Sequence, residues 1–133
     1  MPGEKPIPVS TFPDVLQYIS VNLGQNGSGV VAADQPIFHC ERDTVVDAAF
    51  IRCATADADA TITLKHFTTG AVGSGTAFSS AAALSATAGT VIPVTITDTA
   101  NVIPAGDAIG VDVGGTSTAV GVNVTLRIRT KRK

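Results

Sequence analysis

The segment 119–129 alternates between apolar residues and polar or small residues, and this pattern constrains the fold more than any other feature of the chain. Successive side chains of a β-strand point to opposite faces, so the apolar residues of this segment would all lie on one face. Burying such a side chain stabilises a fold by roughly 1.5 to 3 kcal/mol. The segment therefore predicts a strand that supplies a large part of a core. The apolar residues are Val120, Val122, Val124, Leu126 and Ile128, and the other face carries Gly121, Asn123, Thr125, Arg127 and Arg129.

The rest of the chain also favours strands. Its 133 residues include 17 Thr, 16 Val and 10 Ile but only 5 Leu and 2 Glu, so β-branched residues far outnumber good helix formers. The length suits one domain, which we place at residues 15–133 with a short basic C-terminal tail. We predict an all-β fold, an antiparallel β-sandwich of seven or eight strands with a jelly-roll-like arrangement. Besides 119–129, the expected strands are 15–23, 30–33, 36–40, 44–54, 59–67, 90–97 and 107–113.

Two connections between these strands have distinctive sequences. Residues 68–89 are small, polar and glycine-rich, and a helix over 80–86 would be marginal at that length, so a long connection with one helical turn is expected. Gly114 and Gly115 suit the central positions of a type I′ hairpin turn, because both positions require φ > 0. Such a turn would join 107–113 to 119–129 directly.

The amino-terminal residues 1–14 contain four of the seven prolines. Proline fixes φ and lacks a backbone donor, so this segment is expected to form an extended arm outside the sheets. The arm would lie along a neighbouring subunit or a larger surface, and a frayed terminus is the alternative. The prolines are Pro2, Pro6, Pro8 and Pro13.

Charge is distributed unevenly along the chain. Five of the nine basic residues lie in 127–133, and residues 1–126 hold four basic and eleven acidic residues, a net charge of −7. An acidic body is not expected to bind nucleic acid. The basic end either contacts phosphates or an acidic protein surface, or is a solvated tail, which is the interpretation we favour.

Few residues are available for catalysis, since the chain has two His, two Cys, one Tyr and no Trp. His39 and Cys40 are adjacent on an expected strand and so face opposite sides, and the sequence has no Cys-x-x-Cys pair or His cluster for zinc. Structural roles are favoured for every candidate, so no catalytic, cofactor-binding or metal-binding residue is assigned, and the protein is not expected to be an enzyme. The candidates considered are His39 and His66 as bases or ligands, Cys40 and Cys53 as nucleophiles, and Asp47 as an orienting acid.

The two cysteines are expected on two different strands. Cys40 and Cys53 would pack as buried thiols that act as small hydrophobic residues, and a cross-strand disulfide is the alternative.

Several local motifs have weak matches to ligand-binding loops. Residues 109–118 resemble the first phosphate-binding segment of sugar kinases and other actin-like ATPases, but only 15 residues follow, too few for the α/β domain that completes such a site. The Gly-x-x-Gly-x-Gly segments at 24–29 and 70–75 precede no expected helix and are interpreted as loops. Asp57 and Asp59 are spaced like the start of a calcium loop that lacks its Gly and Glu, so they are interpreted as solvated loop carboxylates.

The sequence has no apolar stretch of 18 or more residues, and its first residues lack the charged and apolar regions of a signal peptide. Synthesis in a cytosol is therefore expected, with no membrane partner.

A proline-rich start, an Ile-Pro-Ala-Gly-Asp-Ala-Ile turn and strand at 103–109, and a valine-alternating last strand ending in Arg and Lys occur together here. In a chain rich in Ala, Thr, Gly and Val, this combination resembles the small decoration (cement) and head-fibre proteins of tailed bacteriophages over residues 15–129. The resemblance implies a β-sandwich that assembles as a homotrimer on the outside of a capsid, with its arm on the major capsid protein and no catalysis. It also implies a virion protein made in the cytoplasm of a bacterial host.

The small side chains on the expected strand faces support such a role, because they lose little conformational entropy when another chain packs on them. The alternative is a tail-fibre or adhesin-like module that binds surface glycans or another virion protein. One Tyr and no Trp leave few aromatic platforms for sugars. A small hydrolase is the remaining alternative.

Overall fold

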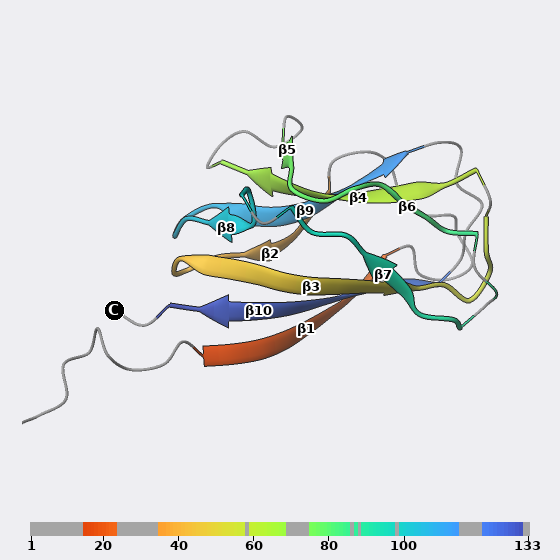
Figure 1. The fold of residues 1–133 in the computed structure, drawn as a ribbon, viewed down its shortest axis with the longest axis horizontal. Coiled ribbons are helices and arrows are strands. Elements are labelled where there is room, and N and C mark those ends of the chain that lie inside the picture. The colour runs from red at the N-terminus through yellow and green to blue at the C-terminus, as the bar shows by residue number, and fades with distance from the viewer. Residues whose placement is uncertain are drawn as a thin grey trace, which may run out of the picture.

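In the part of the chain that the computed structural model describes, ten strands form two antiparallel sheets that pack face to face (Figure 1). No helix occurs among the described residues, which confirms the predicted all-β sandwich. The arm over 1–14 and the strand expected at 30–33 lie outside the described residues. The structure describes residues 15–23, 35–57, 59–68, 75–85, 87, 89–97, 99–114 and 121–131.

Each sheet has five strands within these described ranges. We call them sheet A and sheet B. Sheet A has the order β1 (Val15–Leu23), β10 (Val122–Thr130), β3 (Thr44–Arg52) and β7 (Ile92–Val94), and β8 (Val102–Ile103) also pairs with β3. Sheet B has the order β2 (Gln35–His39), β9 (Ala108–Gly114), β4 (Thr61–Phe67) and β5 (Thr76–Ala77), and β6 (Ala82–Ala83) also pairs with β4.

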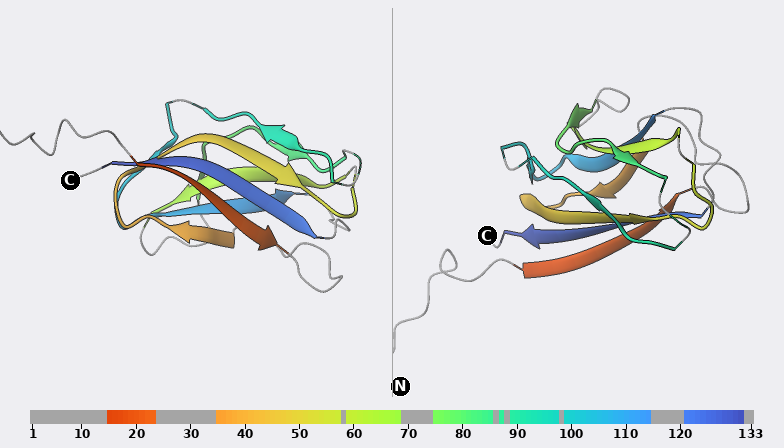
Figure 2. Two further views of the ribbon diagram at one scale, coloured as in Figure 1. Left: turned by 90° about the horizontal axis from the view of Figure 1, so that it is seen from below. Right: turned by 45° about the vertical axis from the view of Figure 1, so that its right-hand side comes forward.

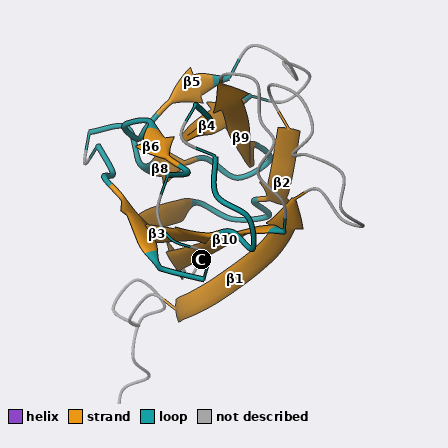
Figure 3. Ribbon diagram, turned by 90° about the vertical axis from the view of Figure 1, so that its right-hand side faces the viewer, coloured by secondary structure: helices purple, strands orange, loops and turns teal. Residues whose placement is uncertain are grey.

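The chain alternates between the two layers as it proceeds. It runs through β1 in sheet A, β2 in B, β3 in A, β4 to β6 in B, β7 and β8 in A, β9 in B and β10 in A. The short strands β5 and β6 act as one interrupted strand, and so do β7 and β8, which gives eight strands in the order 1-10-3-7 against 2-9-4-5. This is a jelly roll, and the two layers are visible end-on in Figure 3.

The core lies between the inner faces of the two sheets, and β10 supplies its centre. Val122, Val124, Leu126 and Ile128 are all fully buried, as the alternation predicts, while Val120 lies outside the described residues. Ile62 and Leu64 of β4 face them from sheet B. The strands predicted at 15–23, 44–54 and 107–113 are found within two residues of their expected bounds.

The long connection predicted over 68–89 is wrong for its described residues, which contain β5 and β6 and no helix. Between β5 and β6, the side chain of Ser79 takes the place of a backbone partner, so that hydrogen bonding to β4 continues. The N–H of Leu64 donates to Ser79 Oγ at 2.8 Å, and the Leu64 carbonyl accepts from the N–H of Phe78 at 3.0 Å. A serine hydroxyl that replaces a backbone hydrogen-bond acceptor produces no alternating pattern, so the sequence does not predict these two strands.

A direct hairpin between 107–113 and 119–129 is also excluded. β9 pairs with β2 and β4 in sheet B, whereas β10 pairs with β1 and β3 in sheet A. The chain is therefore in sheet B at Gly114 and in sheet A at Val122.

Replacing Ser79 with alanine should destabilise the fold by roughly 1 to 3 kcal/mol, because it leaves the buried N–H of Leu64 without its acceptor. Urea unfolding followed by circular dichroism would measure the change. The matched control is Ser80→Ala, since Ser80 is exposed and its role in the sheet is carried by its backbone N–H. Equal stabilities for the two variants would contradict the assignment.

Candidate interaction surface

Two of the residues with catalytic potential, Cys40 and His66, both lie near Asp107. His39 is exposed and Cys40 is fully buried, so the two neighbours face opposite sides as expected. Asp47 lies in β3 of sheet A and forms an ion pair with Arg129. His39 lines an open hollow of about 460 Å³ between the ends of the two sheets, together with Phe38 and Arg42.

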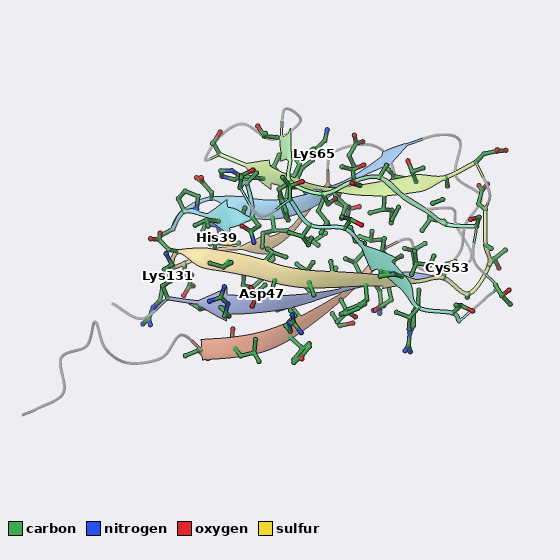
Figure 4. All side chains as sticks on the ribbon, viewed as in Figure 1. His39, Asp47, Cys53, Lys65 and Lys131 are labelled. Atoms are coloured by element: carbon green, nitrogen blue, oxygen red, sulfur yellow. The ribbon has the colours of Figure 1, made fainter. Side chains whose placement is uncertain are left out.

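Cys40 and Cys53 are both free and buried. Cys40 lies four residues before the start of β3 and Cys53 follows its end, and a nine-residue strand spans about 30 Å. Figure 4 shows the separation, with His39, the neighbour of Cys40, at one end of the sandwich and Cys53 at the other. A disulfide needs Cα atoms within about 7 Å, so the alternative of a disulfide between them is excluded.

Burial raises the pKa of both thiols above their ordinary value of 9.0. In Cys40 a hydrogen bond with the Thr44 side chain lowers the pKa in part, and the nearby Asp107 carboxylate raises it. Both thiols should resist a thiol-specific disulfide reagent at pH 8 in the native protein and react fully in denaturant. Rapid labelling of the native protein would contradict this expected resistance.

The raised pKa values also make stability depend on pH, because the thiols ionise at a lower pH in the unfolded chain than in the native protein. The stability that the protonated native thiols contribute is complete below pH 9 and is lost as the pH rises above it.

His66 of β4 lies against Asp107, which the sequence does not suggest. The His66 Nε2 and Asp107 Oδ2 atoms are 2.7 Å apart, and both side chains are mostly buried. Asp107 directly precedes β9, the strand beside β4. The contact between His66 and Asp107 therefore holds the turn at 104–107 against sheet B. On the outer face of the same sheet, Lys65 and Asp112 form an ion pair of 3.0 Å.

The other local motifs have structural roles where they are described. Asp57 Oδ1 accepts a hydrogen bond from the backbone N–H of Asp59 at 2.9 Å, which is an Asx turn and gives the Asp57 carboxylate a structural role. Within the segment that resembles an ATPase loop, residues 109–114 belong to β9 and 115–118 lie outside the described residues. Residues 24–29 and 70–74 also lie outside them.

The large hydrophobic side chains that are exposed gather on sheet A. In the described part of the chain they are Leu16, Tyr18, Val91 and Val102, with exposed fractions of 55%, 64%, 39% and 47%. In the β1–β10 register, Leu16 lies opposite Arg129 and Tyr18 lies opposite Arg127. These two apolar residues and two arginines therefore share the face that points away from the core. Val102 lies opposite Val45, which lies opposite Arg129 on the same face. We call this surface the outer face of sheet A, and the left-hand view of Figure 2 shows β1, β10 and β3 side by side in it.

This face is basic although the chain as a whole is acidic. The charged residues in the five strands of sheet A are three arginines and Asp47. The register of β10 and β3 shifts between Arg127 and Ile128, and this irregularity gives β3 an extra residue, Asp47. Its carboxylate accepts from Arg129 Nε at 2.7 Å. The arginines are Arg52, Arg127 and Arg129.

The fold is distantly similar to a chain in the structure of the infectious bursal disease virus Gx strain, with 12% identity and a TM-score of 0.38 over 90% of this chain. The alignment covers 32% of the other chain, so this chain spans about a third of its length. No family model matches the chain, and no curated protein matches it in sequence. No helix long and apolar enough to cross a membrane is found in the described ranges.

The polar end of the outer face of sheet A is a shallow hollow of about 500 Å³. Asn123 Nδ2 donates to Ser20 Oγ and to Asn22 Oδ1, each at 2.8 Å, and Thr125 Oγ1 donates to Asn123 Oδ1 at 3.0 Å. These bonds fix the side chains of β1 and β10 relative to each other. The hollow is lined by Ser20, Phe50, Arg52, Val91, Asn123 and Thr125.

The alternation in 119–129 predicts that Arg127 and Arg129 lie on the outer side of their strand, and the register confirms it. The same pattern does not predict that Leu16, Tyr18 and Arg52 lie on that face beside them. The exposed apolar residues in 15–23 were the available signal, since Leu16 and Tyr18 occupy the face that a solvated strand would fill with polar residues.

Proposed function

We propose that the protein is a structural component of a virus particle that decorates and stabilises a bacteriophage capsid by binding its outer surface as a homotrimer, without catalysis. The observation that carries the proposal is the outer face of sheet A, where exposed apolar side chains alternate with arginines across neighbouring strands. The jelly-roll strand order is compatible with this role, because viral capsid domains use the same order.

The composition of this face suits a protein interface better than a solvated surface. Tyrosine and arginine are enriched in interface cores and carry much of their binding energy. Tyr18 stands directly opposite Arg127 on neighbouring strands, so a partner would cover both together. Both residues lie in paired strands, so their backbone is already ordered before binding.

Electrostatics favours an acidic partner for this face. Three arginines against one aspartate give it a positive charge, while residues 1–126 as a whole carry −7. Opposite charges across an interface speed association and fix orientation. The major capsid protein is therefore proposed to offer an acidic patch with apolar groups between its carboxylates.

Cosedimentation with capsids assembled without this protein tests the proposal. The wild-type chain should bind saturably, and the double variant Tyr18→Ser with Arg127→Glu should bind at least tenfold more weakly. Thr76→Glu adds a negative charge at an exposed position on β5 of sheet B, away from the proposed interface, and should bind like the wild type. Failure of the wild-type protein to bind would remove the proposed function, and light scattering of the bound and free protein would test the trimer.

A glycan-binding module is the second candidate, favoured by the exposure of Tyr18 and by the polar hollow beside it. An aromatic ring next to amide and hydroxyl groups is suited to a sugar, although Tyr18 is a single platform. Binding to a glycan array that is lost in Tyr18→Ala, together with no binding to capsids, would favour this candidate.

A further inference from the structure

β1 is an edge strand of sheet A among the described residues. It pairs with β10 along its whole length, and no described strand pairs with its other side. Its nine residues, VLQYISVNL, include no charged residue, proline or glycine. A long edge without such residues presents a row of backbone donors and acceptors to any other strand. Figure 3 shows β1 at the border of sheet A.

The other edges of the two sheets carry the protection that β1 lacks. β2 has only five residues, contains Pro36, and shifts register between Pro36 and Phe38. β7 has three residues with Pro93 at its centre, and β5 has two. Short length, proline and irregular register each prevent pairing with a further strand. The contrast within one molecule marks β1 as the edge suited to association.

We infer that β1 pairs antiparallel with β1 of a second copy, with Ile19 opposite Ile19 on a two-fold axis. Residues 15, 17, 19, 21 and 23 point towards the core side of sheet A. In a continuous sheet, two residues that lie directly opposite each other point to the same side. An odd-numbered residue of one copy must therefore pair with an odd-numbered residue of the other, so the two residue numbers add to an even number. The register centred on Ile19 meets this condition and pairs all nine residues, Val15 with Leu23 at either end.

A second copy fits this edge because the strand is complementary to itself. A two-fold contact places each residue against a residue of the same strand, and a strand without charges meets no like-charge repulsion there. The Arg127 side chains of the two copies would be separated by two β1 strands, a spacing of about 14 Å, which is beyond the screening length at physiological salt. The two Tyr18 rings would be diagonal neighbours on the outer face.

This contact needs no capsid and goes beyond the proposed function. One strand pair with its flanking side chains buries less than the roughly 1,000 Å² of a stable interface, so association should depend on concentration. A three-fold assembly would have to use other surfaces.

Cysteine cross-linking in the full-length chain tests the register. Ile19→Cys should form a disulfide-linked dimer under mild oxidation, seen on a non-reducing gel. Leu16→Cys is the control on the same strand, since its two copies would lie about 20 Å apart and should remain unlinked. Wild-type protein should remain unlinked as well, because Cys40 and Cys53 are buried.

Sedimentation equilibrium gives a second measurement. The mass of the wild type should rise with concentration towards an even number of copies. Tyr18→Lys should lower the association constant at least tenfold, because it places cations diagonally across the axis, and Thr76→Lys on β5 should not. Tyr18 is 64% exposed, so the substitution leaves the core intact. A monomeric wild type, or equal cross-linking at positions 16 and 19, would overturn the inference, and neither result bears on capsid binding by the outer face of sheet A.

Discussion

A chain that ends after Gly121 is expected not to fold. Such a truncation removes β10, the strand that joins β1 to β3 in sheet A. It takes four fully buried side chains out of the core, worth roughly 6 to 12 kcal/mol of burial. That loss is comparable with the entire stability of a typical domain, about 5 to 15 kcal/mol. Circular dichroism and one-dimensional proton NMR should show no cooperative thermal transition and no dispersed amide signals.

A chain that ends after Lys131 is the matched control. It keeps β10 and the bond from the Lys131 N–H to the Asp43 carbonyl, at 2.9 Å, and removes only two basic residues. Its melting temperature should lie close to that of the full chain. A cooperative transition in the shorter truncation would show that the core does not depend on β10, contrary to its place between two long partners.

The long strands could be predicted from the sequence because their signal is local. β10, β1 and β3 each show alternation or a sustained run of strand-forming residues, and burial follows that pattern in β10 position by position. The alternation also predicts which residues face the core, because every second side chain of a regular strand points to the same side of the sheet. These three strands form most of sheet A, so the sandwich itself was predictable.

The short strands could not be predicted, because contacts distant in sequence hold them in place. The backbone N–H and carbonyl of Val46 are both satisfied by Asn101, whose own carbonyl and Nδ2 lie 3.0 Å and 2.9 Å away. This buried asparagine bridges the interval between β7 and β8 beside β3. Ser79 does the same between β5 and β6. The sequence around a single polar residue in a loop-like segment does not indicate which distant backbone group that residue binds.

The interaction surface was predictable in part for a related reason. The outward direction of Arg127 and Arg129 follows from alternation within one strand. Their neighbours depend on which strands lie side by side and in which register, and β1 and β10 are about a hundred residues apart in the chain. The same limit hid the contact between His66 and Asp107, which requires β4 and β9 to be adjacent.

Replacing Gly110 with alanine is expected to destabilise the fold by about 3 kcal/mol, the upper part of the range for overpacking. Gly110 lies in β9 between β2 and β4, and the ring of Phe67 rests on it. An added Cβ would stand 2.7 Å from the backbone oxygen of Gln35 and would overlap the Phe67 ring at Cε2. The backbone oxygen belongs to a paired strand, so it has little freedom to move away.

Phe67 explains why a glycine is needed here. Its side chain projects from the outer side of sheet B, yet it is only 1% exposed, because it packs into the space left by Gly110 and Gly75. In the Gly110→Ala background, Phe67→Leu should restore part of the stability by removing the ring overlap, while the contact with Gln35 stays unrelieved. Gly89→Ala is the control, since a Cβ there meets nothing within 4 Å and only the φ of +77° opposes it, at about 1 kcal/mol. Urea unfolding of the four proteins would measure the differences, and a Gly110→Ala variant as stable as Gly89→Ala would show that β2, β9 and Phe67 are not packed as closely as described.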